Sequence, residues 1–304
     1  MKYRILTGLA LLGLAVGYAC GKEDPTDPNG TSTGTGTGSS GTTNADGTCA
    51  LTNNTTETTT LNSMGCALLT RDTSSCDTSR AAQGLTGAWL KFSCRVTLTK
   101  SGSNVVVATD GLPDSKSPYF GSSDACYAAM TSTATAAGRK VNPNKLAAAN
   151  LSLTIPVTGT AAASDTATNM GAIGVAVNGV AIYSNAAGPG DNIYNEISTF
   201  DQCQGHPVPN GQYHYHVEPP TIANADAKLI GIMRDGFPIY GIQDVDGSTP
   251  TLDSAGGHTG TTIDSPSTPV YHYHAAIQSN NSGTSAYFLS TAKYKGTAGA
   301  CTGC

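Results

Sequence analysis

The stretch Ile173-Gly-Val-Ala-Val-Asn-Gly-Val-Ala-Ile-Tyr183 recurs further along the chain as Ile230-Gly-Ile-Met-Arg-Asp-Gly-Phe-Pro-Ile-Tyr240. In each copy, a central pair, Asn178-Gly179 or Asp235-Gly236, is flanked by alternating apolar residues. Asn-Gly and Asp-Gly tolerate the positive φ angles of a two-residue hairpin turn. Each stretch therefore predicts a short β-hairpin, and the chain carries this hairpin twice.

Two further blocks follow each predicted hairpin in the same order. The first block, Phe200-Asp-Gln-Cys-Gln-Gly-His206, matches Leu252-Asp-Ser-Ala-Gly-Gly-His258. The second block, Tyr213-His-Tyr-His216, matches Tyr271-His-Tyr-His274. Because the blocks keep their order while the loops between them differ in length, the sequence indicates an internal duplication of residues 173–218 and 230–276.

The pattern outside the duplication also predicts a mainly β fold. Apolar and polar residues alternate in three stretches, Trp89 to Leu98, Asn104 to Ala108 and Leu151 to Val157, as they do in half-buried strands. The helix expected in the chain lies in the Ala-rich stretch Ala125 to Lys140. We expect a β-sandwich or barrel-like body with few short helices, stabilised by disulfides.

The composition is typical of an exported, loop-rich protein. Charged residues make up 12% of the 304 residues, about half of the roughly 25% that is usual in soluble domains. The net charge is −5 and there is no Lys/Arg cluster, so nothing favours a nucleic-acid backbone as a partner. No phosphate-binding Gly-rich loop precedes a predicted helix, and we expect no nucleotide or other organic cofactor.

The first residues have the features of a lipoprotein leader. Two basic residues precede the apolar run Ile5 to Ala19, which is typical of a secretory signal peptide and too short to span a bilayer. Gly17-Tyr-Ala-Cys20 resembles a bacterial lipobox, although Gly17 stands where leucine is usual. We expect removal of residues 1–19 and a lipid on Cys20 that anchors the protein in the bacterial cell envelope, facing the periplasm or the cell surface. Ordinary cleavage near Ala19 is the alternative.

The rest of the chain divides by composition into three parts. Residues 20–48 are rich in Pro, Gly, Ser and Thr and have no periodic apolar face, which predicts a flexible tether after the lipidated cysteine. Residues 49–88 hold three cysteines and few large apolar side chains, so disulfides are expected to hold this segment. Residues 89–304 form the main domain with its two repeats.

Without Cys20, eight cysteines remain, an even set that predicts up to four disulfides in an oxidising compartment. Cys301-Thr-Gly-Cys304 has the spacing of a redox motif, but no βαβ pattern precedes it. A structural role is therefore expected, and Cys203 is one candidate partner for this pair.

All six histidines of the chain fall within the duplicated region. Each copy offers one loop histidine and a His-x-His pair: His206 with His214 and His216, and His258 with His272 and His274. Side chains i and i+2 of a strand point to one face, so each pair projects together while the tyrosines cover the other face. Three imidazoles suit Zn or Cu and leave a fourth position open. Asp201 and Asp253, five residues before the loop histidines, are candidates for fixing a ring tautomer or for a further ligand.

The sequence leaves three functions open. The first is the binding of Cu(II) or Zn(II), at two separate sites or at one shared site. The second is a metal-dependent hydrolase or oxidase that acts on an extracellular substrate such as a surface polymer. The third is a metal-free carbohydrate-binding or adhesion module with a polymer or protein partner at the cell surface. The two copies differ at most positions yet agree on all three histidines, which favours a metal over a solvated polar face.

In combination, the motifs resemble the YHYH-domain protein family. The resemblance rests on Gly205-His206, Tyr213-His-Tyr-His216, Asp235-Gly-Phe-Pro-Ile-Tyr-Gly241, Gly257-His258 and Tyr271-His-Tyr-His274, and it covers about Trp89 to Cys304. Asp110-Gly-Leu-Pro-Asp114 resembles an early element of the family, but Ser115 and Lys116 follow where a histidine is expected, and Ala255 stands where a cysteine is common. The resemblance implies an exported protein and no defined activity.

Overall fold

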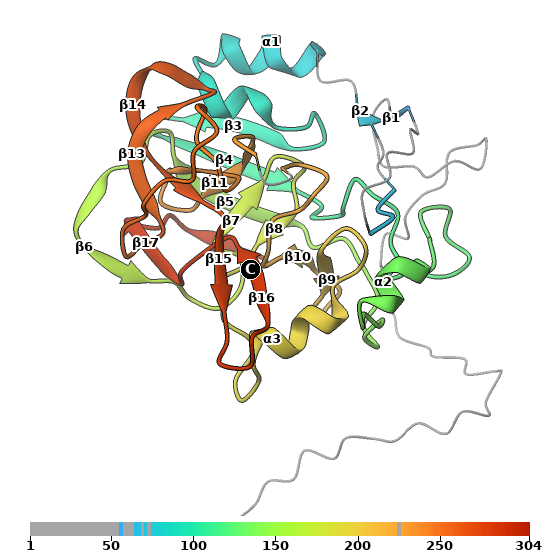
Figure 1. Ribbon diagram of the computed structural model, residues 1–304. Coiled ribbons are helices and arrows are strands. Elements are labelled where there is room, and N and C mark those ends of the chain that lie inside the picture. The colour runs from blue at the N-terminus through green and yellow to red at the C-terminus, as the bar shows by residue number, and fades with distance from the viewer. Residues whose placement is uncertain (1–54, 57–63, 68–69, 72–73, 224–225) are drawn as a thin grey trace, which may run out of the picture. The chain divides into compact units, whose positions relative to one another are not determined.

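The computed structural model describes residues 55–56, 64–67, 70–71, 74–223 and 226–304 (Figure 1). The chain divides into two units, Met1–Thr37 and Gly38–Cys304, and every described residue belongs to the second unit. The expected signal peptide, the lipidated Cys20 and the tether up to residue 48 lie outside the described residues. Within them, no helix has the length and apolar character that crossing a membrane requires.

An eight-stranded sheet in the order β13-β14-β12-β11-β7-β8-β10-β9 forms the centre of the fold. Its first half comprises β7 (Gly174–Ala176), β8 (Ala181–Ile182), β9 (Gly205–Pro207) and β10 (Tyr213–Tyr215). Its second half comprises β11 (Leu229–Met233), β12 (Pro238–Tyr240), β13 (Gly257–Thr262) and β14 (Ser265–His274).

The two halves of this sheet repeat one pairing pattern. In each half, the two hairpin strands pair antiparallel, the second hairpin strand pairs parallel with the Tyr-His-Tyr-His strand, and that strand pairs antiparallel with the strand of the loop histidine. The halves meet at β7 and β11, which are antiparallel. A pseudo-twofold relation between β7 and β11 follows, and the predicted internal duplication is confirmed.

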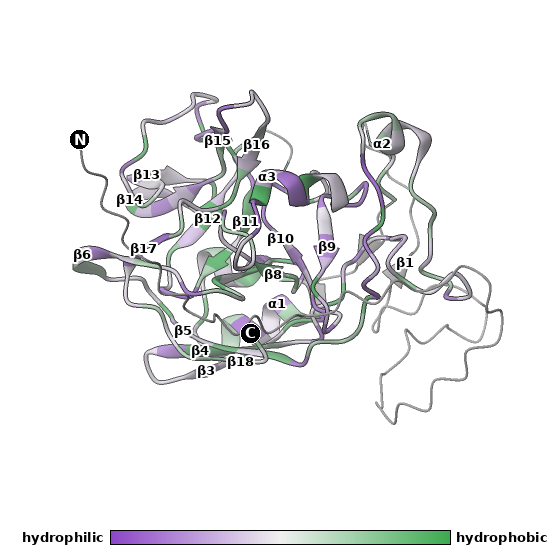
Figure 2. Ribbon diagram, turned by 90° about the horizontal axis from the view of Figure 1, so that it is seen from below, coloured by the Kyte–Doolittle hydropathy of each residue, from purple (hydrophilic) through white to green (hydrophobic). Residues whose placement is uncertain are grey.

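Close backbone approach explains a glycine at the centre of the sheet. A Cβ atom added to Gly231 in β11 would lie 2.1 Å from the carbonyl oxygen of Val175 in β7, far inside van der Waals contact. Both strands are buried along their whole length, and Figure 2 gives the hydropathy of each residue along the ribbon. Glycine is therefore needed at the place where the halves meet.

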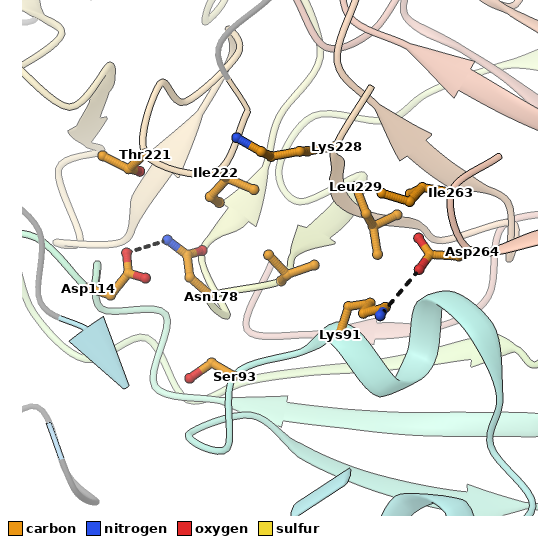
Figure 3. A pocket seen from close by; sticks show the side chains of 11 residues that line it. Lys91, Ser93, Asp114, Asn178, Thr221, Ile222, Lys228, Leu229, Ile263 and Asp264 are labelled. Atoms are coloured by element: carbon orange, nitrogen blue, oxygen red, sulfur yellow. Dashed lines mark hydrogen bonds and ion pairs between the residues drawn. The ribbon is translucent and has the colours of Figure 1, made fainter. Parts of the chain in front are cut away.

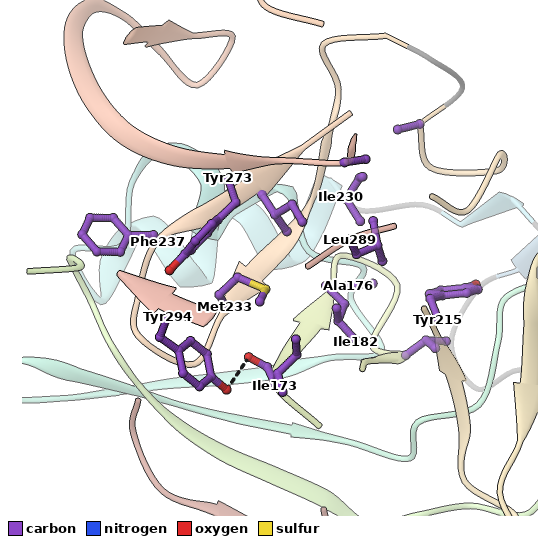
Figure 4. Packing of buried hydrophobic residues seen from close by; sticks show 14 of the residues in the cluster. Ile173, Ala176, Ile182, Tyr215, Ile230, Met233, Phe237, Tyr273, Leu289 and Tyr294 are labelled. Carbon is purple, nitrogen blue, oxygen red and sulfur yellow. Dashed lines mark hydrogen bonds between the residues drawn. The ribbon is translucent and has the colours of Figure 1, made fainter. Parts of the chain in front are cut away.

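Two apolar clusters cover the two faces of the central sheet. On one face, Ile173, Ile182, Ile230, Met233 and Tyr215 belong to one buried cluster (Figure 4). On the other face, Val175, Ala181 and Ile232 pack with apolar residues of a four-stranded sheet. That sheet has the order β18-β5-β4-β3 and comprises β3 (Thr97–Ser101), β4 (Asn104–Thr109), β5 (Leu151–Pro156) and β18 (Cys301–Thr302). The result is two sheets packed face to face.

The remaining elements of the described residues are short. Three two-stranded sheets pair β1 (Thr55–Thr56) with β2 (Thr70–Arg71), β6 (Ala161–Ala167) with β17 (Lys293–Gly296), and β15 (Ala276–Ser279) with β16 (Ser285–Phe288). The helices are α1 (Ser74–Ala82), α2 (Ser132–Ala136) and α3 (Ile193–Glu196), with 3-10 helices η1 (Gly87–Lys91) and η2 (Ile197–Thr199). The mainly β class with few short helices is confirmed.

Two local predictions differ from the structure. The stretch from Trp89 begins as η1, and a strand starts only at Thr97, because the Trp89 indole donates to the Val157 carbonyl at 2.8 Å and Cys94 is bonded to Cys76. The expected helix at 125–140 is reduced to α2, where Thr131 caps the start and Gly138 ends the turn at φ 81°.

Disulfides hold the body as expected. The described residues contain Cys66–Cys203, Cys76–Cys94 and Cys301–Cys304, and Cys126 is also disulfide-bonded. Cys203 thus pairs with the Cys-rich segment and not with the last residues of the chain. Its counterpart in the second copy is Ala255, so this bridge belongs to the first half alone.

Candidate metal centres

Each half of the central sheet gathers its three histidines into one group. His206 lies directly opposite His214 across β9 and β10, and His258 lies directly opposite His272 across β13 and β14. His216 and His274 complete the groups two residues further along. Within each group the ligand atoms lie within 4.8 Å of one another, an arrangement that could hold a metal ion. The six histidines thus form two groups, one in each half.

The tyrosines between the histidines point to the opposite face, as strand alternation predicts. Tyr213 and Tyr215 join the buried apolar cluster on that side, together with Tyr273. The Tyr213 hydroxyl donates to Asp201 at 2.9 Å, and the Tyr273 hydroxyl donates to Asp235 at 2.5 Å. The histidine faces therefore contain imidazole without the neighbouring phenols.

Backbone carbonyls fix the tautomers of four rings. His214 Nδ1 lies 3.3 Å from the Gln212 oxygen and His216 Nδ1 lies 2.5 Å from the Ser184 oxygen. In the second group, His272 Nδ1 is 2.9 Å from the Val270 oxygen and His274 Nδ1 is 2.6 Å from the Gly241 oxygen. Because a carbonyl oxygen only accepts, each Nδ1 carries the proton and each Nε2 presents a lone pair.

The loop histidine of the first group follows the same rule through a hydroxyl. Thr199 Oγ1 donates to the Glu196 carbonyl at 2.8 Å, so at 2.7 Å it accepts the proton of His206 Nδ1. His206 Nε2 is buried and has no hydrogen-bond partner among the described residues. The lone pair of His206 therefore also points into the group without a donor to satisfy it.

The Nε2 atoms face one another at the spacing of metal ligands. His214 Nε2 lies 2.9 Å from His216 Nε2, and His258 Nε2 lies 3.2 Å from His274 Nε2. With the protons on Nδ1, the first of these pairs brings two lone pairs together, and no hydrogen bond can join them. Zn–N bonds of about 2.0–2.1 Å in a tetrahedral site place ligand atoms about 3.3 Å apart. A cation between the rings would resolve this repulsion.

A carboxylate adjoins each group, and neither residue was among those predicted for the site. Asp244 Oδ1 lies 3.3 Å from His258 Nε2 and 3.5 Å from both His272 Nε2 and His274 Nε2. Glu196 Oε2 lies 3.7 Å from His206 Nε2 and 3.6 Å from His216 Nε2. Each carboxylate comes from the segment between the hairpin and the loop histidine of its own copy, which is the signal that could have located it.

Asp201 and Asp253 have equivalent positions, but neither contacts an imidazole in the described part of the chain. Asp201 Oδ1 accepts from the amides of Cys203 and Gly205 at 2.8 and 3.3 Å, and Asp253 Oδ1 accepts from those of Ala255 and Gly257 at 2.9 and 3.3 Å. Each also accepts from the first tyrosine of its motif. These carboxylates shape the loops that present His206 and His258, whereas the tautomer contacts come from carbonyls and Thr199.

Burial favours the neutral, metal-binding form of five rings, those of His206, His214, His216, His272 and His274. It lowers the pKa of His206 to about 3 and the pKa values of His216 and His274 to about 4. The pKa values of His214 and His272 are lowered as well, again chiefly by burial. Burial also raises the pKa of Glu196, and the nearby Asp191 adds to this effect.

Aromatic packing makes the first group the more enclosed of the two. Tyr183 stacks on His214 with ring centroids 3.9 Å apart, and Phe200 stacks on His216 at 5.7 Å. The side chain of His206 is 7% exposed, whereas that of His258 is 20% exposed. The second group is therefore more open to solvent at its loop histidine.

Two cavities of the described residues have no histidine in their walls. The larger, of about 410 Å³, is lined by residues that include Lys91, Asp114, Asn178 and Asp264 (Figure 3). The second, of about 340 Å³, has Trp89 and Tyr240 in its wall. The wall of the second cavity also includes Val270 and Tyr240, which contact His272.

Comparison with known proteins gives one match. Residues 152–250 match the family model described as YHYH protein. This range contains the first copy and the hairpin of the second copy. No curated protein and no solved structure matches the chain.

Proposed function

We propose that this chain, which is a YHYH-family protein by the match over residues 152–250, binds two transition-metal ions, one in each half of the central sheet. The first ion is held by His206, His214 and His216, with Glu196 beside them. The second is held by His258, His272, His274 and Asp244. The function is metal binding by an exported protein.

The convergence of unprotonated Nε2 atoms supports this proposal most strongly. Histidines of a solvated polar face would direct their ring nitrogens to water, whereas His214 and His216 are 1% and 2% exposed. Their Nδ1 protons are held by carbonyls on the outside of the group. A buried lone pair without a donor is costly, and a shared cation removes this cost.

The donor set favours Zn(II), with Cu(II) as the second choice. The second group offers three imidazoles and the Asp244 carboxylate, the first group offers three imidazoles with Glu196 near two of them, and the cysteines of the described residues are in disulfides. Soft thiolate ligands are therefore not offered, which disfavours Cu(I). Asp244 lies at nearly equal distances from three Nε2 atoms, as the fourth corner of a tetrahedron does. Zn(II) prefers this geometry, and Cu(II) prefers a tetragonal one.

Metal analysis of single-site variants tests the proposal. The chain is exported to an oxidising compartment, purified without a His-tag or chelator, and analysed by plasma mass spectrometry after exposure to Zn(II). We expect two equivalents in the parent protein and one in each of His214→Ala and His272→Ala. Each variant is the matched control of the other, and circular dichroism checks that both are folded. An unchanged metal content in both variants would contradict the assignment.

We also propose export and lipid anchoring through Cys20. The basic and apolar leader and the lipobox-like Gly17-Tyr-Ala-Cys20 support this proposal, and disulfides persist in oxidising compartments. Metabolic labelling with a radioactive fatty acid tests it. The parent protein should be labelled and sediment with membranes, and Cys20→Ser should lose both properties. Equal labelling of the two proteins would overturn the proposal.

A further inference from the structure

We propose that the Cys301–Cys304 disulfide is a thiol–disulfide exchange site for a protein dithiol, and that Gln212 transmits its redox state to the first histidine group. The exchange site stands on its own observations. The effect on the histidines rests on the proposed metal-binding function.

The accessibility of this disulfide differs from that of the bridge that joins distant parts of the body. Cys304 is exposed and Cys301 is half-buried. Cys66 and Cys203, which also form a bridge, are both 0% exposed. Thiol–disulfide exchange requires an attacking thiolate to reach one sulfur along the S–S axis, and exposed disulfides are the labile ones. An attacking thiol can approach Cys304, whereas the Cys66–Cys203 sulfurs are covered.

The ring closed by Cys301 and Cys304 spans a sequence separation of three, against 137 for Cys66–Cys203. A disulfide stabilises a fold more when it closes a longer loop, so the small ring contributes least to the stability of the body. Backbone bonds hold the segment in any case. Cys301 pairs with Leu153 in the sheet, and the Thr154 amide donates to the Ala300 carbonyl at 2.9 Å. Opening the ring therefore leaves the fold intact.

A chain of contacts leads from this ring to the first histidine group. The Gln212 side chain, in a residue that is 2% exposed, donates through Nε2 to the Gly303 carbonyl at 3.2 Å. Its Oε1 accepts from the Tyr183 hydroxyl at 2.6 Å. Tyr183 stacks on His214, and the Gln212 backbone carbonyl accepts the Nδ1 proton of that ring. Gln212 is thus a positioning residue with one contact in the disulfide ring and two that lead to His214.

The second histidine group lacks this connection. At the position equivalent to Gln212 it has Val270, whose carbonyl accepts from His272 Nδ1 at 2.9 Å but whose side chain has no hydrogen-bonding atom. The tyrosine equivalent to Tyr183 is Tyr240, and its hydroxyl lies within hydrogen-bond distance of Thr262 Oγ1 and Asp264 Oδ2, at 3.0 and 3.1 Å. Reduction of Cys301–Cys304 should therefore affect the first group and leave the second group unchanged.

The partner dithiol supplies the two electrons and two protons that reduction of Cys301–Cys304 requires. A thiolate of the partner dithiol attacks Sγ of Cys304, an exposed residue, the S–S bond breaks, and Cys301 leaves as the thiolate. The second thiol of the partner, after losing its proton, attacks the partner sulfur of the mixed disulfide and releases the Cys304 thiolate. The protein gains two electrons and two protons, and the partner becomes a disulfide. Freed from the ring, Gly303 no longer holds the Gln212 amide in place.

Mapping of the first thiols to appear tests the exchange site without any metal. The oxidised full chain is treated with limiting dithiothreitol, quenched with iodoacetamide and analysed by peptide mass spectrometry. We expect Cys301 and Cys304 to be alkylated first, while Cys66, Cys203, Cys76 and Cys94 remain bridged. Alkylation of Cys76 and Cys94 at the same or a greater rate would overturn the proposal.

Cobalt(II) titration tests the coupling, because its visible spectrum reports a tetrahedral site. In His272→Ala, cobalt binding is measured at the first group alone, because the second group lacks a ligand. In His214→Ala, cobalt binding is measured at the second group alone. Each is measured with Cys301–Cys304 intact and with both residues changed to serine, which opens the ring without adding thiols that would bind cobalt. We expect binding by the first group to weaken by about tenfold, the lower end of the 10–100-fold range that follows loss of an outer contact to a ligand, and binding by the second group to stay constant. Equal changes in both groups would contradict the coupling.

Absence of cobalt binding in all proteins would overturn the metal proposal and leave the exchange site standing.

Discussion

At the scale of single residues, buried neutral histidines make the metal-free protein sensitive to acid. The unfolded chain protonates His206, His216 and His274 at a pKa near 6.5, whereas burial lowers their pKa values to about 3, 4 and 4 in the fold. Between these limits the unfolded state binds more protons, so stability is fully present above pH 6.5 and is lost as the pH falls toward 4. Each ring changes the free energy of unfolding by up to about 1.4 kcal/mol per pH unit.

Urea unfolding of chelator-treated protein at pH 7 and pH 5 measures this effect. We expect a lower midpoint at pH 5, and a smaller difference between the two values in His274→Gln, which has one ring fewer. Buried carboxylates such as Asp201, whose pKa is raised by burial, act in the opposite direction and are common to both proteins. An identical pH dependence in parent and variant would show that His274 is not buried in its neutral form.

Residue types and strand alternation predict which histidines gather, but not what faces them. His214 and His216 lie on one face because they are two residues apart on a strand. Glu196 and Asp244 arrive from connecting segments of different length and conformation, so no sequence period places them near the rings. Asp201 and Asp253 are at a fixed spacing before the loop histidines, yet the loop amides and the tyrosines use their oxygens.

At the scale of elements, the hairpin at the centre of the sheet depends on Gly231. A Cβ atom there would meet the Val175 carbonyl of β7 at 2.1 Å, so Gly231→Ala must separate the two strands. We expect it to destabilise the fold by about 1–3 kcal/mol, as overpacking of a core does. Gly188→Ala is the matched control, because an added Cβ atom there meets nothing within 4 Å. Urea midpoints that fall equally in the two variants would refute this role of Gly231.

Turn chemistry predicts the hairpins well, and periodicity alone predicts other elements poorly. Asn178-Gly179 and Asp235-Gly236 lie at the hairpin turns as predicted, but only the glycines have positive φ, at 91° and 88°. The predicted two-residue turn with positive φ at both centres is therefore wrong, because the Gly179 amide donates to the Ala176 carbonyl and the Gly236 amide donates to the Met233 carbonyl, which places the turn before the glycine. The alternation from Trp89 is equally regular, but the stretch begins as a 3-10 helix and becomes a strand only at Thr97, since tertiary contacts of Trp89 and Cys94 fix it. Helix α1 lies in a segment without an apolar period, beside the Cys76–Cys94 bridge.

At the scale of the whole molecule, the two histidine groups lie in one continuous sheet with a shared core. The central sheet is continuous through β7 and β11, and residues of both halves pack on the four-stranded sheet in one cluster. A ligand that binds only the folded state stabilises all of it, by about 2.7 kcal/mol at a free concentration of 100 Kd. Zinc bound in either half should therefore raise the melting temperature of a single transition.

Calorimetry with and without Zn(II) measures this linkage in the parent protein, in His214→Gln, in His272→Gln and in the double variant. We expect a shift of one transition in the parent, a smaller shift in each single variant, and none in the double variant, since each ion contributes its own binding free energy. Glutamine keeps the side chains polar and close to the original size, so the comparison does not depend on cavities in the core. Two separate transitions would show that the halves unfold independently, and a zinc-dependent shift in the double variant would place the metal at residues other than these histidines.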